Sequence, residues 1–265
     1  MATPTELCEL AASTARATGT LLLDALDVVR TDVQTKSTGT DMVSEVDRAA
    51  EALIVERILG ARPDDGIVGE EGTDRPGTSG VRWIVDPLDG TTNYLYGLAG
   101  FAVSIAVEVD GVVSAGVVLD VVRGELFAAT LGGGATRDGS PIRSSTLTDL
   151  RTALVATGFA YDSEVRARQA EVLTTVLPRV RDIRRFGAAA VDLCAAACGR
   201  VDGYYEGGLA PWDLAAGGLI AAEAGAVVSD LSGGPAVAGE IVVAAGPHLA
   251  AALRDLLVRA GAASP

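Results

Sequence analysis

The chain has 265 residues, of which 49% are hydrophobic, and it carries 35 acidic against 21 basic side chains. This size and apolar content can bury a substantial core in one large domain or in two closely packed halves, and they exclude a disordered chain. The net charge of -14 opposes binding to phosphate backbones, so we expect no direct nucleic-acid partner.

The N-terminus has no basic segment followed by an apolar core, and no uninterrupted apolar run approaches the roughly 18 residues of a membrane span. We therefore expect a cytoplasmic protein with no membrane segment. The three cysteines, Cys8, Cys194 and Cys198, lack metal-binding spacing and fit reduced thiols. The last two lie at helical spacing in an alanine-rich segment, which favours buried helix packing. The only histidine, His248, lies beyond the motifs and is expected on a surface helix.

Helical periodicity opens the chain. Apolar residues at helical spacing predict helices over residues 5–30 and 44–60, joined by the polar segment TDVQTKSTGTD, which is expected to form a turn or loop. From residue 81 the pattern changes to short β-rich runs, with Asp110-Gly111 as a hairpin signal. We therefore predict a mainly antiparallel sheet formed by VRWIVD, FAVSIAVEV, VVSAGVVLDV and ELFAAT.

The glycine-rich segment 131–150 is the predicted waist of the chain. It separates two closely packed halves, at about 1–145 and 146–265, of a single domain. The second half mixes strands and helices, which predicts a layered α+β or α/β sandwich. The predicted strands are 153–157, 203–205, 226–230 and 241–245, and the predicted helices lie near 163–180, 187–199 and 212–224 and from 247 onward.

The segment WIVDPLDGTTNYLYG places two carboxylates, Asp86 and Asp89, at the end of an apolar run. Pro87 between them stiffens the backbone, so both side chains and an intervening carbonyl can converge on a cation. Gly90 and Thr91 then offer backbone N–H groups to a phosphate. A simple turn is the alternative interpretation. Because hard divalent cations such as Mg2+ take oxygen ligands, the segment favours a metal-dependent phosphatase.

Three further acidic segments are ambiguous when each is taken alone. In GIVGEEGT, Glu70 follows a short apolar strand, either in a solvated loop or as a metal ligand. In APWDLAAGG, Asp213 lies in the first turn of an apolar helix, where aspartate also serves as a helix cap. The segment KSTGTDMVSEVD, with Lys36, Asp41 and Asp47, is most simply a polar loop followed by an exposed helix face.

Taken together, the residues and order of the four segments resemble the inositol monophosphatase family, within the lithium-sensitive, Mg2+-dependent phosphatases that include fructose-1,6-bisphosphatases. The resemblance spans about residues 10–245, and its two long signatures are WIVDPLDGTTNYLYG and WDLAAGGLIAAEAGA. It implies an α+β fold, the five-layered αβαβα sandwich of that family, usually as a homodimer.

The resemblance also implies the functional residues and a cofactor of two or three Mg2+ ions per subunit. The implied metal ligands are Glu70, Asp86, the Leu88 carbonyl, Asp89 and Asp213. The implied catalytic residues are Glu70 and Thr91, which would orient the attacking water, together with Asp86. The residues implied to meet the substrate are Asp89, Gly90, Thr91, Ala189, Glu206 and Asp213.

The implied activity is hydrolysis of myo-inositol 1-phosphate to myo-inositol and phosphate by a metal-activated water, that is, an inositol-1-monophosphatase. Thr92 after the first threonine, and Glu206 in GYYEGG, resemble the inositol branch of the family. Ala188, where relatives often carry serine or threonine, leaves fine specificity open. The alternatives are a related sugar phosphatase, such as a fructose-1,6-bisphosphatase, and an interaction module of the transcription machinery, which some bacterial relatives bind.

Overall fold

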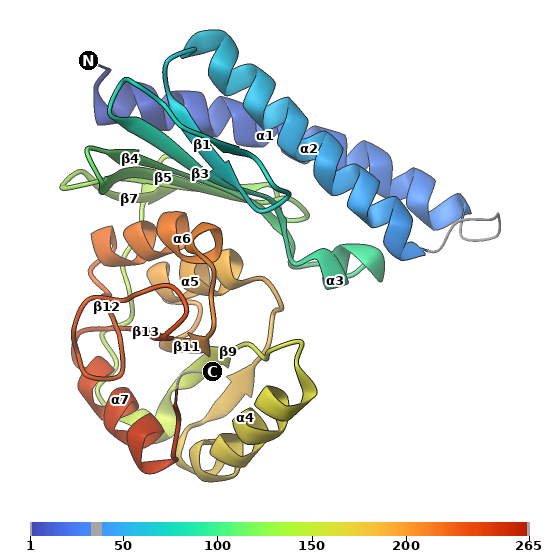
Figure 1. The fold of residues 1–265 in the computed structure, drawn as a ribbon. Coiled ribbons are helices and arrows are strands. Elements are labelled where there is room, and N and C mark those ends of the chain that lie inside the picture. The colour runs from blue at the N-terminus through green and yellow to red at the C-terminus, as the bar shows by residue number, and fades with distance from the viewer. Residues whose placement is uncertain (1, 33–38, 264–265) are drawn as a thin grey trace.

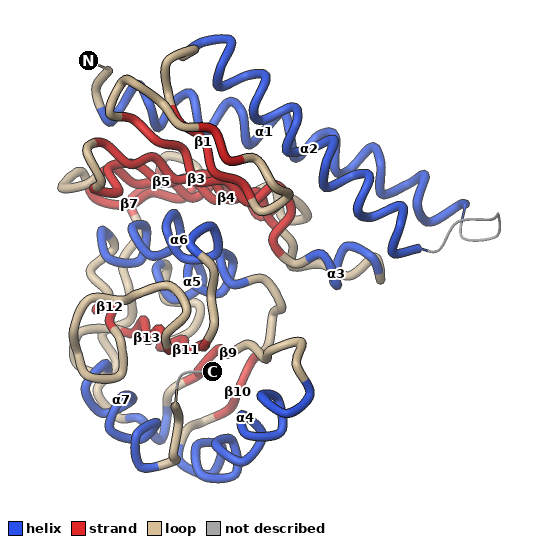
Figure 2. The backbone as a smooth tube through the Cα atoms, in the orientation of Figure 1, coloured by secondary structure: helices blue, strands red, loops and turns tan. Residues whose placement is uncertain are grey.

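The computed structural model of the chain describes residues 2–32 and 39–263. Of the segment 31–41 expected to form a turn or loop, residues 33–38, which include Lys36, lie outside the described residues, and so does the side chain of Asp41. The two ends of this segment are helical, which the sequence did not predict. The described elements stack in five layers, in the order helices, sheet, helices, sheet, helices (Figure 1). Figure 2 shows the same order by type, with each sheet lying between helices. The predicted five-layered αβαβα sandwich is therefore confirmed.

The first layer is a pair of long helices, α1 (Pro4–Asp32) and α2 (Gly39–Ala61). Their apolar faces pack on the larger sheet, where Leu7, Leu22 and Ile54 are fully buried. Apolar residues recur every three or four positions in both helices, and this spacing places them on one face. Both predicted helices are confirmed, although the second begins earlier than expected.

The second layer is an eight-stranded sheet with the order β2-β1-β3-β4-β5-β6-β7-β8. Its pairs are antiparallel apart from β1 with β3, which confirms a mainly antiparallel sheet. Trp83 and Ile105 pack toward the first layer, while Ile84 and Val118 pack toward the third. Burial on both faces explains why the strands are apolar nearly throughout. The strands are β1 (Gly66–Gly69), β2 (Asp74–Arg75), β3 (Val81–Asp89), β4 (Ala102–Val109), β5 (Val112–Asp120), β6 (Glu125–Thr130), β7 (Gly134–Arg137) and β8 (Ser140–Pro141).

Strands β7 and β8 lie in the segment 131–150, which the sequence predicts only as a waist. They contain four and two residues, and strands this short show too little alternation to be recognised. The pair Asp138-Gly139 forms the tight turn between them, as an Asp-Gly pair indicates. The larger sheet therefore extends into the predicted waist.

The third layer consists of α5 (Ala189–Ala197) and α6 (Pro211–Glu223), which lie between the two sheets (Figure 1). Both helices are rich in small residues, so they pack closely against each other and against strands on either side. Cys194 is fully buried in this layer and Cys198 is half-buried. The expected role of Cys194 in helix packing is confirmed.

The smaller sheet has the order β10-β9-β11-β13-β12, and α4 (Ser163–Val176) and α7 (Ala250–Arg259) cover its outer face. The predicted helix near 163–180 ends early, because Leu177–Arg179 forms a 3-10 turn that contains Pro178. The sequence did not predict the three-residue strand β10. The strands are β9 (Leu154–Thr157), β10 (Asp182–Arg184), β11 (Gly203–Gly207), β12 (Val227–Ser229) and β13 (Ile241–Ala245), with a 3-10 turn at Leu150–Thr152 before β9.

Two remaining expectations concern the surface. His248 is exposed as predicted, but it lies in a turn before α7 and not within a helix. Across residues 2–32 and 39–263, the structure contains no helix with the length and apolar character that a membrane crossing requires.

Candidate active site

The acids of the DPLDG segment lie at the end of β3, where its pairing with β4 shifts register between Asp86 and Asp89. Pro87 and Leu88 form the irregular stretch, and an irregularity of this kind redirects the flanking side chains. The Leu88 N–H donates to Asp86 Oδ1 at 2.9 Å, and Thr91 Oγ1 donates to the Leu88 carbonyl at 3.1 Å. The segment therefore orders two carboxylates, a carbonyl and a hydroxyl, which is more than a simple turn requires.

Gly90 joins β3 to the short helix α3 (Thr91–Leu95) in a left-handed conformation, with φ 90° and ψ 35°. A Cβ atom there would lie 2.7 Å from the Gly100 carbonyl oxygen and 3.1 Å from the Ala188 Cβ. Residues with a side chain rarely adopt such a φ, and here the space is also filled. Only glycine therefore fits at this junction, where the backbone turns beside the acids.

Replacing Gly90 with alanine is expected to destabilise the protein by about 1–3 kcal/mol, because the strained φ and the contact with Gly100 act together. Chemical denaturation measures the effect. Gly124→Ala is the matched control, since Gly124 also has a positive φ of 66° but open space around its Cβ position. An equal loss of stability in both variants would show that the contact contributes nothing.

Two helix N-termini face the acids. Asp89 accepts hydrogen bonds from the Ala189 N–H at 3.2 Å and the Ala190 N–H at 2.7 Å, in the first turn of α5. Asp213, in the first turn of α6, accepts from the Ala210 N–H at 2.7 Å. Asp213 is therefore a helix cap, as one interpretation of the sequence held, and it also faces the other acids. The positive ends of the two helix dipoles favour negative charge at this point.

One oxygen each from Asp86, Asp89 and Asp213 lies within 4.8 Å of the others. Burial raises the pKa of Asp86 and Asp89 well above the usual range, and neighbouring acids raise both pKa values further. Burial also raises the pKa of Glu70, which follows β1 and interacts with Asp86. Buried carboxylates this close cannot all ionise without a compensating cation. The oxygen-only donor set fits a hard divalent cation.

All the site residues expected from the sequence line one cavity of about 150 Å³ between the layers. They come from segments far apart in the chain, namely the end of β1, the β3–α3 junction, the start of α5, β11 and the start of α6. They are Glu70, Asp86, Leu88, Asp89, Gly90, Thr91, Ala189, Glu206 and Asp213. The structure adds the finding that these residues, which are distant in the chain, lie in one cavity.

The sequence model of the inositol monophosphatase family matches residues 3–261. The chain belongs to the inositol monophosphatase family. It is 46% identical over 243 residues to the inositol-1-monophosphatase of Mycobacterium leprae (strain TN), with 88% of this chain and 84% of that protein covered. It is 41% identical over 230 residues to the Nus factor SuhB of Escherichia coli (strain K12), with 86% of each covered. The solved structure of Mycobacterium tuberculosis SuhB matches with a TM-score of 0.86 and 39% identity, covering 99% of both chains.

Membership of the inositol monophosphatase family supports a phosphatase. Of the two relatives, one is named inositol-1-monophosphatase and the other Nus factor SuhB. The acidic cavity is consistent with a metal-dependent member of this family.

Glu206 lies on β11 and lines the cavity from the second half of the chain. The Tyr204 hydroxyl donates to Glu206 Oε2 at 2.8 Å, and burial raises the pKa of Glu206 to about 7. Gly158 makes room for this carboxylate, because a Cβ atom there would lie 2.0 Å from it. The sequence analysis did not identify Gly158, since nothing adjacent in the sequence indicates that a glutamate from another strand fills its space.

Further residues of the cavity were also missed. Arg185 is the only basic residue among the described residues that line it. Tyr161 lies at the cavity too, with its hydroxyl 3.4 Å from the Thr92 hydroxyl. A basic residue just before the FGAAA segment was an available signal for Arg185. The remaining lining residues that the sequence did not indicate are Phe159, Gly187 and Leu209, whereas Ala188, noted for its bearing on specificity, also lines the cavity.

The prediction that Asp47 lies on an exposed helix face is wrong, because its side chain is only 5% exposed. Asp47 shares its face of α2 with Ala50 and Ile54, which pack on the sheet, and this periodicity could have revealed the burial. Burial raises the pKa of Asp47 to about 8, and the charges of Glu71 and Glu70 add to the effect. The helix therefore brings a further acid close to Glu70.

Proposed function

We propose that this chain is a Mg2+-dependent phosphomonoesterase that hydrolyses myo-inositol 1-phosphate to myo-inositol and phosphate. The observation that carries the proposal is the convergence of three aspartates from two distant segments in one cavity, where Asp86 and Asp89 are buried and Asp213 is half-buried. Membership of the inositol monophosphatase family, and the relative named inositol-1-monophosphatase, support the same activity.

We propose that Glu70, Asp86, the Leu88 carbonyl, Asp89 and Asp213 hold two or three Mg2+ ions. Bound ions would neutralise the carboxylates, polarise the phosphoryl group and activate the attacking water. Mg2+ is favoured because the ligands are all oxygens and the substrate supplies phosphate oxygens.

The residues of the chain position the reactants. Thr91 donates its hydroxyl hydrogen to the Leu88 carbonyl, which leaves the Thr91 oxygen free to accept a hydrogen bond from the attacking water. Glu70, with its raised pKa, is suited to accept from the same water and to hold its proton. Gly90 and Thr91 open α3, and the first N–H groups of a helix have no acceptor within the helix. These N–H groups are suited to bind the phosphate.

The polyol would lie against the opposite wall, where we propose that Asp89, Ala189, Glu206 and Asp213 meet its hydroxyl groups. Carboxylates suit hydroxyl donors, and Glu206 can accept from two of them. Among the described lining residues, Arg185 is the only basic side chain. A single basic side chain beside the proposed metal ligands suits one phosphate, which favours an inositol monophosphate over fructose 1,6-bisphosphate.

A panel of phosphate esters tests the proposal: D- and L-myo-inositol 1-phosphate, fructose 1,6-bisphosphate, 3'-phosphoadenosine 5'-phosphate and histidinol phosphate, each with Mg2+ and with EDTA. We expect phosphate release that requires Mg2+ and is fastest with an inositol phosphate. Faster release from fructose 1,6-bisphosphate would agree with the proposed metal-dependent hydrolysis. It would contradict myo-inositol 1-phosphate as the preferred substrate. No release from any ester would contradict phosphatase activity itself.

A second proposed function is that of an interaction module of the transcription machinery, supported by the relative named Nus factor SuhB. The net charge of -14 would suit a basic protein surface as the partner. The two functions can coexist, since the acids of the cavity are needed only for the first. We further propose that the protein acts in the cytoplasm as a homodimer, as the family resemblance implies.

A further inference from the structure

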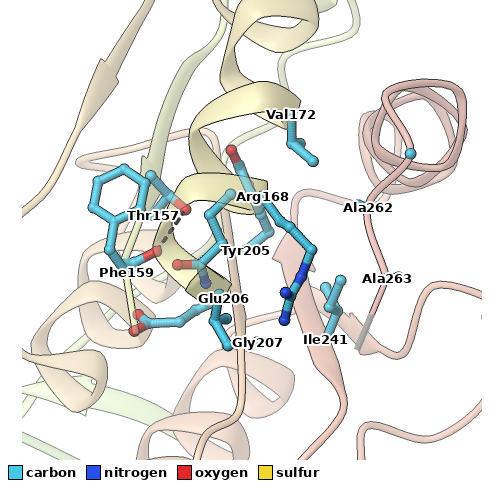
Figure 3. Close-up of a pocket in the computed structure, with 14 residues that line it drawn as sticks. Thr157, Phe159, Arg168, Val172, Tyr205, Glu206, Gly207, Ile241, Ala262 and Ala263 are labelled. Atoms are coloured by element: carbon cyan, nitrogen blue, oxygen red, sulfur yellow. Dashed lines mark hydrogen bonds between the residues drawn. The ribbon is translucent and has the colours of Figure 1, made fainter. Parts of the chain in front are cut away.

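A second cavity, of about 90 Å³, lies beside the catalytic one (Figure 3). It is bounded by α4, the ends of β9 and β11, the start of β13 and residues 261–263. Gly158, Phe159 and Glu206 line both cavities, so the two share a wall. The lining is mainly apolar, from Phe159, Val165, Val172, Tyr205 and Ile241.

Arg168 is the basic residue of this second cavity. Its side chain extends from α4 toward Gly207 and Ile241 (Figure 3). Within the described residues its guanidinium has no salt bridge and no hydrogen-bond acceptor, and its charge acts only at a distance on Asp162. The Glu206 carboxylate points away from Arg168 (Figure 3) and accepts the Tyr204 hydroxyl. Arg168 is therefore an exposed cation with no protein partner among the described residues, at the edge of an apolar cavity.

We propose that the second cavity binds a small organic monoanion, whose carboxylate pairs with Arg168 and whose apolar body packs on Val172 and Ile241. A purely apolar molecule would make no use of the positive charge at the edge of the cavity, and a polyol phosphate would leave the apolar walls without contacts. The volume, which is smaller than that of the catalytic cavity, suits a compact ligand such as benzoate.

Occupancy of this cavity changes the catalytic cavity through the segment 158–161. Gln169, which lines the second cavity, accepts a hydrogen bond from the Ala160 N–H at 2.9 Å. The next residue, Tyr161, lines the catalytic cavity. A ligand that packs on Phe159 and Gln169 therefore favours one arrangement of the segment 158–161. This arrangement alters the KM for a phosphate ester bound in the catalytic cavity. This effect on KM rests on the proposed phosphatase function, whereas binding itself does not.

Benzoate binding to the full chain, measured by isothermal titration calorimetry, tests the site. We expect saturable binding that Arg168→Gln weakens by at least about 10-fold, because a charge-assisted hydrogen bond is lost. Arg185→Gln is the matched control, since Arg185 is an exposed arginine that lines the other cavity. It is expected to leave the affinity unchanged. Val172→Trp, which fills the second cavity, is expected to abolish binding.

No saturable binding, or equal binding by wild type and Arg168→Gln, would overturn the proposal. Loss of binding in Arg185→Gln alone would also overturn it, because benzoate would then occupy the catalytic cavity. In the phosphate-release assay, benzoate is expected to shift KM by about 5-fold or more in wild type and not in Arg168→Gln. An unchanged KM despite binding would disprove the effect on catalysis. If no ester is hydrolysed, the calorimetric result still decides whether the site exists.

Discussion

Asp86→Asn is expected to lower Mg2+-dependent phosphate release by more than about 100-fold, since even residues that only support metal ligands cost roughly 10- to 100-fold when replaced. Asparagine keeps the shape of the side chain and an oxygen that can accept the Leu88 N–H, so the turn at the end of β3 remains. What disappears is one negative charge at the centre of the acidic cluster.

The same substitution is expected to raise the thermal stability of the protein in EDTA. Asp86 is 1% exposed and faces the charges of Asp89, Glu70 and Asp213, so its ionised form is costly without a cation. Mg2+ is expected to stabilise wild type and to have little effect on Asp86→Asn. Thermal denaturation with Mg2+ and with EDTA measures both effects.

Asp192→Asn is the control for these measurements. Asp192 is also 1% exposed, and burial raises its pKa, but it lies outside the cluster of three aspartates. Neutralising it should leave the stabilisation by Mg2+ in place. If Asp192→Asn abolished the Mg2+ response as completely as Asp86→Asn, the cluster would lose its assignment as the metal site.

The second prediction concerns pH: without divalent cations, the protein is expected to become less stable as the pH rises from about 5 to about 8. The pKa of Asp47 is raised to about 8 and that of Glu206 to about 7. The folded state therefore keeps protons that the unfolded state loses near pH 4, and the free energy of unfolding falls through this range. At pH 8 Asp47 is about half ionised in the folded state, so its effect continues somewhat above that pH.

The fall in Tm between pH 5 and pH 8 in EDTA is expected to be at least about 4 °C, because 1 kcal/mol shifts a domain of this size by roughly 2–4 °C. Mg2+ is expected to oppose the fall most at pH 8, where the carboxylates are ionised. Calorimetric scans at several pH values measure the Tm. In Asp47→Asn, the Tm should change less with pH than in wild type. A Tm that rises over the same range in EDTA would contradict the raised pKa values.

Local patterns predicted the first helices, the mainly antiparallel sheet and the pair of acids in the DPLDG segment, whereas the five-layered order was implied by the resemblance to a known family. Helical spacing identified α1 and α2, and the DPLDG segment identified Asp86 and Asp89 as acids held close together. The resemblance to a known family then supplied residues that no local pattern connects, such as Glu206. The structure brings Glu206 into the same cavity as the two aspartates.

The features that were missed depend on contacts between distant segments. Gly158 is required because Glu206 fills the space that a side chain would occupy. Arg185 belongs to the candidate site because its loop reaches the cavity. Asp47 was placed on the wrong face because its polarity was given more weight than its position relative to Ala50. Strand β10 was missed for another reason: its sequence, DIR, has one apolar residue between two charged ones, whereas the equally short β12 lies in an apolar run and was predicted.

The hydrogen bonds that Asp89 accepts from the first turn of α5 give this aspartate two roles at once. It belongs to the acidic cluster, and it also ties β3 to the first turn of a helix about a hundred residues further along the chain. In a lineage that kept the fold but no longer needed the acidic cluster, we expect that Asp86 could be replaced by a neutral residue that accepts the Leu88 N–H, such as asparagine, whereas Asp89 would be retained for its contacts with Ala189 and Ala190. Persistence of Asp89 in a relative is therefore weak evidence of activity, and persistence of Asp86 is the more telling observation.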